Sequence, residues 1–235
     1  MTPTPSPSPV SSAPPARASS AANLRVCQGT SSVGGVDVSD YDPSTQWTTV
    51  QHSGRGFAFI KATEGTTYTN PLYASDWSSS KSAGLLRGAY HFFHPGDDPT
   101  VQAQFFLRTM GALGANDLPP LLDWEVTDSM SSATQIENAL IWLQAVEAAT
   151  GKIPVIYVAP AFWNALGNPT EFARYPLFIA NYDTSCPDVP PPWSTWTFWQ
   201  TGTGTASGLS SSEADLDVFN GTLTQLTSFA TTGSF

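Results

Sequence analysis

The chain is short of basic residues and of long apolar runs. It has 9 Lys and Arg against 19 Asp and Glu, which gives a formal net charge of -10 over 235 residues. Nucleic-acid binding relies on clustered Lys and Arg that neutralise phosphates, so this balance argues against a nucleic-acid-binding protein. No run approaches the ~18 apolar residues that a membrane-spanning helix needs, and no basic and apolar signal peptide follows Met1.

Cysteine is equally scarce. Cys27 and Cys186 are the only two, and neither stands in a C-x-x-C pair or near a histidine, which argues against a zinc site. A disulfide between them closes a loop of about 160 residues, worth roughly 5 kcal/mol in the chain-entropy model. Two unrelated buried thiols are the alternative. Because low lysine, high Ser/Thr and acidity suit an exported protein, we favour the disulfide and an extracellular or cell-envelope location.

The first 26 residues differ from the rest of the chain. They are rich in Pro, Ser and Ala, and almost no large apolar side chain precedes Leu24. Such a segment buries too little surface to offset its ordering entropy, so we predict a disordered linker over residues 1–26. Repeated proline favours an extended spacer from an anchor or another module, and a frayed tail is the alternative. Residues 27–235 are expected to form one domain.

Eight short apolar runs recur in that domain, each bounded by turn residues. Several are continuously apolar, as in strands covered on both faces, and eight of them predict a closed parallel barrel. The runs are Val36–Val38, Phe57–Ala62, Leu85–Phe93, Leu121–Trp124, Ile153–Val158, Leu177–Ala180, Thr197–Trp199 and Leu216–Phe219.

The spacing of the runs predicts where helices lie. The first five are roughly 23 to 33 residues apart, and helices are expected from Asn70, from Asp98 and over residues 131–150. The last three are roughly 18 to 23 residues apart and are linked by Pro, Gly, Ser and Thr, too little for a crossover helix. We therefore expect an α/β fold: an irregular TIM-like barrel of five β/α units followed by three strands with few or no helices.

Acidic side chains stand at the ends of these runs. Asp123 and Glu125 alternate with Leu122 and Trp124, so both acids share one face of a strand. If the apolar pair packs outward, the acids face the barrel axis at its C-terminal mouth, where barrel enzymes keep their active sites.

Two more acidic positions converge on the same mouth. Asp37 ends the first run, and Asp215 and Asp217 flank Leu216 in the last. The first and last strands of a closed barrel are neighbours, so Asp37 is expected to meet Asp215 or Asp217. Like charges in a partly desolvated pocket cannot all ionise, so at least one carboxyl keeps its proton to a higher pH, as a general acid requires.

Paired carboxylates of this kind are the equipment for cleaving glycosidic bonds. A carboxylate metal site is the competing chemistry, and we rank it lower, expecting no metal and no cofactor. His91 and His94 are the histidines nearest the acids, and we favour a structural role for both over a binding role.

Aromatic residues near the strand ends favour a sugar cleft. Flat rings cover the apolar faces of pyranose rings, and tyrosine hydroxyls bond their polar edges. Core packing is the alternative, and we assign Phe57, Phe59, Trp142 and Phe178 to it. The candidate sugar-binding residues are Tyr90, Phe92, Tyr157, Tyr182 and Trp199, together with Gln200 beside Trp199.

Six short strings together resemble glycoside hydrolase family 25, the Chalaropsis-type lysozymes or N-acetylmuramidases. The resemblance spans residues 33–220, and K-x-T-E-G within the second string is its most specific part. The strings are Gly35–Ser39, Phe59–Gly65, Gly88–Phe92, Leu122–Glu125, Phe198–Gln200 and Ala214–Asp217.

This resemblance implies a barrel of five β/α units with three further strands. It also implies cleavage, with net retention, of the β-1,4 bond between N-acetylmuramic acid and N-acetylglucosamine in bacterial peptidoglycan. Glu125 matches the family's general acid, and Asp123 matches the carboxylate that assists at the sugar C1, directly or through the substrate's 2-acetamido group. Asp37 and Asp215 match two further acids of the cleft.

Two positions depart from the family pattern. Asp42 stands where Asn or Gln is usual, and Asp217 stands where Asn is more common, so both add negative charge near the mouth. Lys61 and Glu64 match the family, and we interpret them as a structural ion pair at a strand end.

Two other functions stay open at this point. One is a non-catalytic glycan-binding module, and the other is a hydrolase for a different glycan such as chitin, which the fold alone cannot exclude. We expect the protein to act as a monomer on peptidoglycan, with no nucleic acid and no membrane span.

Overall fold

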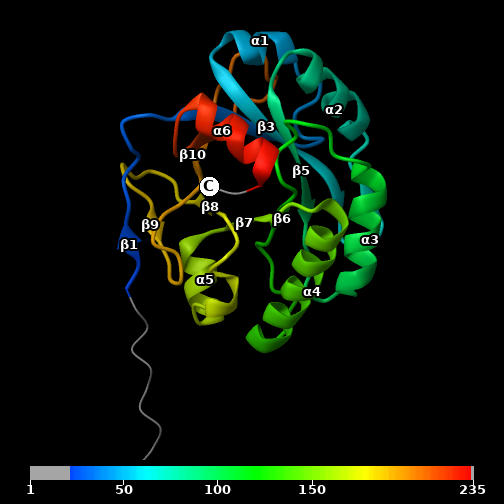
Figure 1. Ribbon diagram of the computed structural model, residues 1–235, viewed down its shortest axis with the longest axis vertical. Coiled ribbons are helices and arrows are strands. Elements are labelled where there is room, and N and C mark those ends of the chain that lie inside the picture. The colour runs from blue at the N-terminus through cyan, green and yellow to red at the C-terminus, as the bar shows by residue number, and fades with distance from the viewer. Residues whose placement is uncertain (1–21, 234–235) are drawn as a thin grey trace, which may run out of the picture.

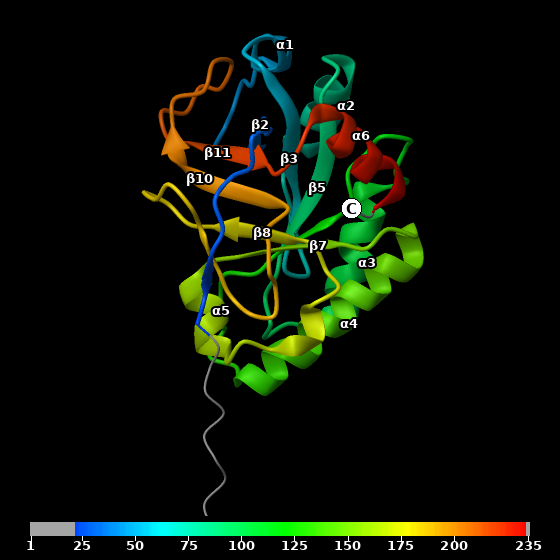
Figure 2. The same ribbon diagram turned by 60° about the vertical axis from the view of Figure 1, so that its left-hand side comes forward.

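A computed structural model describes residues 22–233. Eight strands close into a barrel in the order β2-β11-β10-β8-β7-β6-β5-β3, with β2 paired to β3, and the short β4 extends the end of β3. Helices α1 to α5 lie around the outside of this barrel (Figures 1 and 2). The predicted irregular TIM-like barrel is confirmed.

Each of the eight apolar runs overlaps one barrel strand. The barrel strands are β2 (Val33–Val38), β3 (Arg55–Glu64), β5 (Leu86–Phe92), β6 (Leu121–Asp123), β7 (Val155–Val158), β8 (Leu177–Ala180), β10 (Phe198–Gly204) and β11 (Ala214–Phe219). The short strands β1 (Leu24–Arg25), β4 (Tyr68–Thr69) and β9 (Asp188–Val189) lie outside this set.

Five helices follow the first five barrel strands, as the spacing predicts. They are α1 (Trp47–His52), α2 (Tyr73–Ser82), α3 (Pro99–Met110), α4 (Ser132–Thr150) and α5 (Pro160–Leu166), and a single 3-10 turn covers Thr170–Phe172. Local chemistry sets their ends: Asp98 caps α3, Ser131 caps α4, and Gly151 ends α4 in a left-handed conformation that glycine adopts without steric cost.

A sixth helix, α6 (Leu223–Thr232), follows the last strand and was not expected from the sequence. A capping box between Thr222 and Gln225 begins it. Its buried Leu226 and Phe229 pack with Phe198 and Phe219, and so close the end of the barrel where the parallel strands begin.

The expectation of an all-parallel barrel is wrong at one strand. β11 runs antiparallel to both of its neighbours, β10 and β2. Only a short loop without a helix joins β10 to β11, and such a connection can join antiparallel strands but not parallel ones. As a result β11 begins at the mouth of the barrel, where the other seven strands end.

Large aromatic rings fill the inside of the barrel. Gly35 and Gly88 face inward, and a Cβ atom at either would come within 2.3 Å of the ring of Phe57 or Phe59, respectively. Glycine at these positions therefore lets the phenylalanine rings occupy the axis. A second buried layer, which includes Val36, Leu122 and Trp124 among many others, separates the strands from the outer helices.

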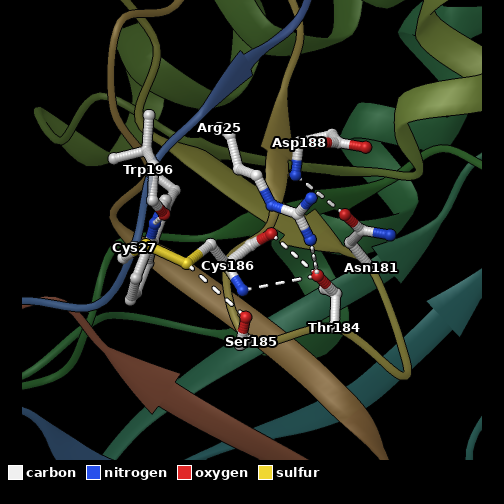
Figure 3. Close-up of a disulfide and its surroundings, with 9 residues drawn as sticks. Arg25, Cys27, Asn181, Thr184, Ser185, Cys186, Asp188 and Trp196 are labelled. Carbon is white, nitrogen blue, oxygen red and sulfur yellow. Dashed lines mark hydrogen bonds between the residues drawn. A yellow bond between two sulfur atoms is a disulfide. The ribbon is translucent and has the colours of Figure 1, made fainter.

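The structured part of the chain begins before the expected boundary at residue 26. β1 pairs antiparallel with β9, joining Leu24 to Val189 and Arg25 to Asp188 in register. Cys27 and Cys186 form a disulfide immediately after this pair (Figure 3). Backbone pairing and the covalent link together hold a segment that its composition alone would leave loose. The rest of the predicted linker, residues 1–21, lies outside the described residues.

Within residues 22–233, no helix is long and apolar enough to cross a membrane.

Candidate active site

Four acidic side chains line one cleft of about 250 Å³ at the mouth of the barrel. Asp37 comes from β2, Asp215 from β11, Asp123 from the last position of β6, and Glu125 from just beyond it. The residues that alternate with them, such as Leu122 and Trp124, are fully buried in the outer layer, as predicted from the two-residue period of a strand.

The reversal of β11 brings Asp37 and Asp215 together. Their Cα atoms are direct partners in the antiparallel β2–β11 ladder. Directly opposite residues in such a ladder lie on the same face with their Cβ atoms about 5 Å apart. Asp217, two residues after Asp215 on β11, is paired with Gly35. It lies deeper in the barrel than Asp215 and is fully buried.

Burial and mutual repulsion oppose the simultaneous ionisation of all the carboxyl groups in this cleft. Burial, with the charges of Asp217 and Asp215, raises the pKa of Asp37 well above its usual range. Burial, with the charge of Glu125, does the same to the pKa of Asp123. The pKa of Asp215 rises to about 6, through burial and the charges of Asp42 and Glu125. The cluster therefore holds protons at a pH where isolated aspartates have lost them.

Gln200 organises the polar groups on one side of the cleft. Its Nε2 donates to Asp37 Oδ2 over 2.7 Å, and its Oε1 accepts hydrogen bonds from the hydroxyls of Tyr157, over 2.6 Å, and of Tyr182. Gln200 is 3% exposed, so its amide is fixed in place by these partners. It positions a catalytic candidate and two candidate sugar contacts.

Lys61 supplies a positive charge to the same cleft. Its Nζ is 2.6 Å from Glu64 Oε2, the ion pair expected at this strand end, and 5.1 Å from the ring centroid of Phe92. Its charge also opposes the rise in the pKa of Asp123. Lys61 therefore forms the structural ion pair expected from the sequence and also lines the cleft beside Asp123.

The aromatic candidates divide into two groups. Tyr90, Phe92, Tyr157 and Tyr182 line the cleft. Trp199 does not, because it faces outward between Phe198 and Gln200, is 5% exposed, and donates its indole N–H to the backbone oxygen of Asn181. Adjacent strand residues point to opposite faces, so Trp199 and Gln200 cannot both face the cleft.

Besides Lys61, four residues of the cleft were not identified as such from the sequence: Ser39, Tyr41, Leu121 and Phe178. Ser39 and Tyr41 lie in the loop after β2, and the Tyr41 ring is 83% exposed at the mouth. Their position after a barrel strand was the available signal, because such loops build the mouth. Phe178 packs in the interior, as expected, but also forms part of the cleft floor.

A model of the family described as glycosyl hydrolases family 25 matches residues 36–209, a range that includes Asp37, Asp123 and Glu125. The chain belongs to glycosyl hydrolases family 25. It is accordingly a glycoside hydrolase.

Relatives with known names agree with this family. The chain is 35% identical over 213 residues to Lysozyme M1 of Streptomyces globisporus, covering 86% of this chain and 72% of that protein. It is 34% identical to the N,O-diacetylmuramidase of Chalaropsis sp, covering 85% of this chain and 99% of that protein.

Solved structures show the same architecture. The bacterial lysozyme from Streptomyces coelicolor superposes with a TM-score of 0.83 at 33% identity, covering 88% of this chain and all of the other. The muramidase from Trichobolus zukalii gives a TM-score of 0.80 at 33% identity, with 86% and 100% covered.

His91 and His94, two of the three histidines of this family 25 enzyme, have different surroundings. His91 is fully buried, with Nδ1 2.8 Å from Thr63 Oγ1 and Nε2 3.0 Å from Gln102 Oε1, and burial lowers its pKa to about 4. His94 lies at the rim between Glu64 and Asp128. Across residues 22–233, no group of three or more His, Cys, Asp or Glu side chains is placed to hold a metal ion.

Proposed function

We propose that this chain is a lysozyme, an N-acetylmuramidase that hydrolyses the β-1,4 bond between N-acetylmuramic acid and N-acetylglucosamine in bacterial peptidoglycan. One observation carries the proposal: Asp123 and Glu125 lie on the same face at the end of β6, opposite Asp37 and Asp215 in one cleft. The names of the relatives, a lysozyme and an N,O-diacetylmuramidase, support the same substrate.

Glu125 is the proton donor in this proposal. It is the exposed member of the four acidic residues and lines the cleft. As the bond between C1 and the bridging oxygen breaks, the Glu125 proton moves to that oxygen, which leaves as a hydroxyl. The resulting carboxylate then takes a proton from the water that completes hydrolysis.

Asp123 is the group that supports the reacting carbon. It acts as the carboxylate, the form that the neighbouring charge of Lys61 favours against burial, and assists at C1 as positive charge develops there, either by attack or by holding the substrate's 2-acetamido group. Both routes pass through two displacements at C1 and therefore retain its configuration. Asp37 and Asp215 complete the acidic wall, and Gln200 orients Asp37.

Glu125→Gln tests this assignment. It should lower the release of reducing ends from purified peptidoglycan by about 10²–10⁴-fold while leaving the thermal unfolding midpoint unchanged. Glu137→Gln, at an exposed position of α4, is the matched control and should keep full activity. Unchanged turnover by Glu125→Gln would remove Glu125 from the mechanism.

Product analysis separates the remaining alternatives. Mass spectrometry of a muramidase digest finds muramic acid at the new reducing end, whereas a chitin-type hydrolase leaves N-acetylglucosamine there. A wild-type protein that binds peptidoglycan without cutting it would favour a binding module.

We further propose that the enzyme works outside the cytoplasm, in the extracellular space or the cell envelope, and as a monomer. The disulfide supports the location because disulfides persist in oxidising compartments. The cleft supports the monomer because strands of a single chain build it.

A further inference from the structure

A second groove of about 550 Å³ lies beside the acidic cleft. The two share Glu125, Tyr157 and Tyr182, so they form one continuous surface that meets at the proposed proton donor. The start of α5 and the end of β8 supply one part of the second groove. The other part includes Asn23 and Asp188, which belong to the segments around β1 and β9.

Asn23 owes its place to a tightly held N-terminal segment. Besides the β1–β9 pair, Val26 donates its N–H to the Pro187 oxygen over 3.1 Å, and the Trp196 indole donates to the Val26 oxygen over 2.8 Å. The disulfide of Cys27 follows directly (Figure 3). The segment is thus held by the pairing of β1 and by the hydrogen bonds and the covalent bond that directly follow it.

The opposite strand is anchored as firmly. Arg25 Nη2 donates to Thr184 Oγ1 over 2.9 Å, and the Asp188 N–H donates to Asn181 Oδ1 over 2.8 Å (Figure 3). Asn181 is itself held to the barrel, since its backbone N–H donates to the Gln200 oxygen over 3.2 Å. The groove wall therefore connects to the same residue that orients Asp37.

The chemistry of this groove suits an N-acetylated sugar. Asn23 and Asn164 line the groove with amide side chains, which both donate and accept hydrogen bonds, and Asn181, whose Oδ1 accepts from the Asp188 N–H, adds an amide donor. Sugar hydroxyls and N-acetyl groups need both kinds of partner. Ala159, Pro160 and Ala161 add a small apolar surface of the kind that covers a methyl group or the face of a sugar ring.

The position of the groove indicates which side of the cleaved bond it would hold. A general acid must touch the oxygen that bridges the two sugars, so the cleft on one side of Glu125 holds the sugar whose C1 reacts. Asp123 belongs to that cleft and does not line the second groove. The second groove is then the side on which the departing sugar lies.

We propose that this groove binds the N-acetylated sugars on the leaving-group side of the cut, and that Asn23 is a specificity-determining residue there. The family model begins at residue 36, so Asn23 is a substrate contact supplied from outside the matched region. This inference rests on the proposed muramidase activity, and it makes the N-terminal segment part of the enzyme's working surface.

The test compares Asn23→Ala with Leu24→Ala. Leu24 is the adjacent residue and is 50% exposed, but it does not line the groove. Its substitution therefore changes the same segment without removing a side chain from the groove. With peptide-free peptidoglycan glycan strands as substrate, Asn23→Ala should raise KM about fivefold, as for the loss of one hydrogen bond, with kcat within about twofold. Leu24→Ala should leave both constants unchanged.

Three results would overturn the inference. An unchanged KM for Asn23→Ala shows that the residue does not contact the glycan. A loss seen only with peptide-bearing strands assigns the groove to the stem peptide instead. An equal loss in Leu24→Ala attributes the effect to the strand pairing rather than to the Asn23 side chain.

A binding measurement separates this inference from the proposed activity. In the Glu125→Gln background, calorimetry with the same peptide-free strands should show about fivefold weaker affinity when Asn23→Ala is added. If the wild type cuts no peptidoglycan but this loss of affinity is found, the muramidase proposal fails and the sugar-binding groove stands. If the wild type cuts and the affinity is unchanged, the groove assignment alone fails.

Discussion

The side-chain amide of Gln200 donates a hydrogen bond to Asp37 Oδ2 over 2.7 Å, across the barrel mouth from β10 to β2. The two residues are 163 positions apart in the chain, and β11 lies between their strands. Because the Gln200 oxygen also accepts from Tyr157, the orientation of the amide is determined by its partners. A buried amide thus fixes which oxygen of Asp37 is free to face the cleft.

Gln200→Ala should lower kcat about tenfold or more with little change in fold. Burial and the charges of Asp217 and Asp215 raise the pKa of Asp37, and the Gln200 hydrogen bond opposes that rise. Without this bond the pKa of Asp37 rises further, so the acidic limb of the pH–rate profile should move to higher pH. Steady-state rates from pH 3 to 8 measure both effects. Thr203→Ala, at an exposed position of β10, is the control, and an identical profile for the two variants would contradict the prediction.

Asp217→Asn should stabilise the protein at neutral and alkaline pH. Asp217 is fully buried, and no described residue donates a hydrogen bond to either carboxylate oxygen. Burial and the charge of Asp215 raise its pKa well above its usual value. The folded protein therefore keeps this proton where the unfolded chain has lost it, so the wild type loses stability as pH rises above about 4.

The size of that effect is measurable by thermal unfolding between pH 4 and pH 8. At pH 8 the variant should unfold at least about 2 °C above the wild type, and the difference should shrink toward pH 4, where the side chain of Asp217 is about half protonated even in the unfolded chain. Glu213→Gln, at an exposed position, should show no such trend. If the unfolding midpoints of the wild type and of Asp217→Asn changed in parallel with pH, Asp217 would ionise in the folded protein as it does in the unfolded chain.

His94→Gln should destabilise the protein more at acidic pH than at alkaline pH. His94 Nδ1 is 3.1 Å from Asp128 Oδ1, and Nε2 is 3.3 Å from Glu64 Oε1. Partial burial opposes the charged ring, but the hydrogen bonds and charges of these two carboxylates raise the pKa of His94 overall. Its contribution is therefore complete below the unfolded pKa of about 6.5 and is lost as pH rises through the folded pKa.

The expected loss is modest because the His94 side chain is 31% exposed. Solvent-screened pairs are worth about 0.5–1 kcal/mol, so the unfolding midpoint should fall by about 1–4 °C at pH 5.5 and by less at pH 9. His52→Gln, at the exposed end of α1, should change neither value. A loss that is equal at both pH values would indicate a packing role for the ring instead.

Removing the disulfide should weaken the whole domain. Cys27 and Cys186 are 159 residues apart, so their bond restricts most of the unfolded chain. The double variant Cys27→Ser/Cys186→Ser should lose about 2–5 kcal/mol of unfolding free energy in urea titrations. A thiol reductant should destabilise the wild type similarly and leave the variant unaffected. No difference between wild type and variant would mean that the noncovalent contacts around β1 already provide this stability.

Local patterns in the sequence determined most of the framework. Eight apolar runs identified the eight barrel strands, and the two-residue alternation alone placed Asp123 and Glu125 on one face. Capping residues such as Asp98 and Ser131 predicted where helices begin. These features depend on a few neighbouring residues, so the sequence is sufficient to reveal them.

Only the tertiary structure decided the rest, because it depends on contacts between distant segments. The direction of β11 follows from a short loop and its pairing with two other strands, and this direction brings Asp215 to the mouth and buries Asp217 below it. From the sequence, Trp199 and Gln200 were both candidates for sugar binding. The pleat of β10 places Trp199 in the outer layer and Gln200 in the cleft. The place of Asn23 depends on the pairing of β1 with β9, which the composition of the N-terminal segment cannot reveal.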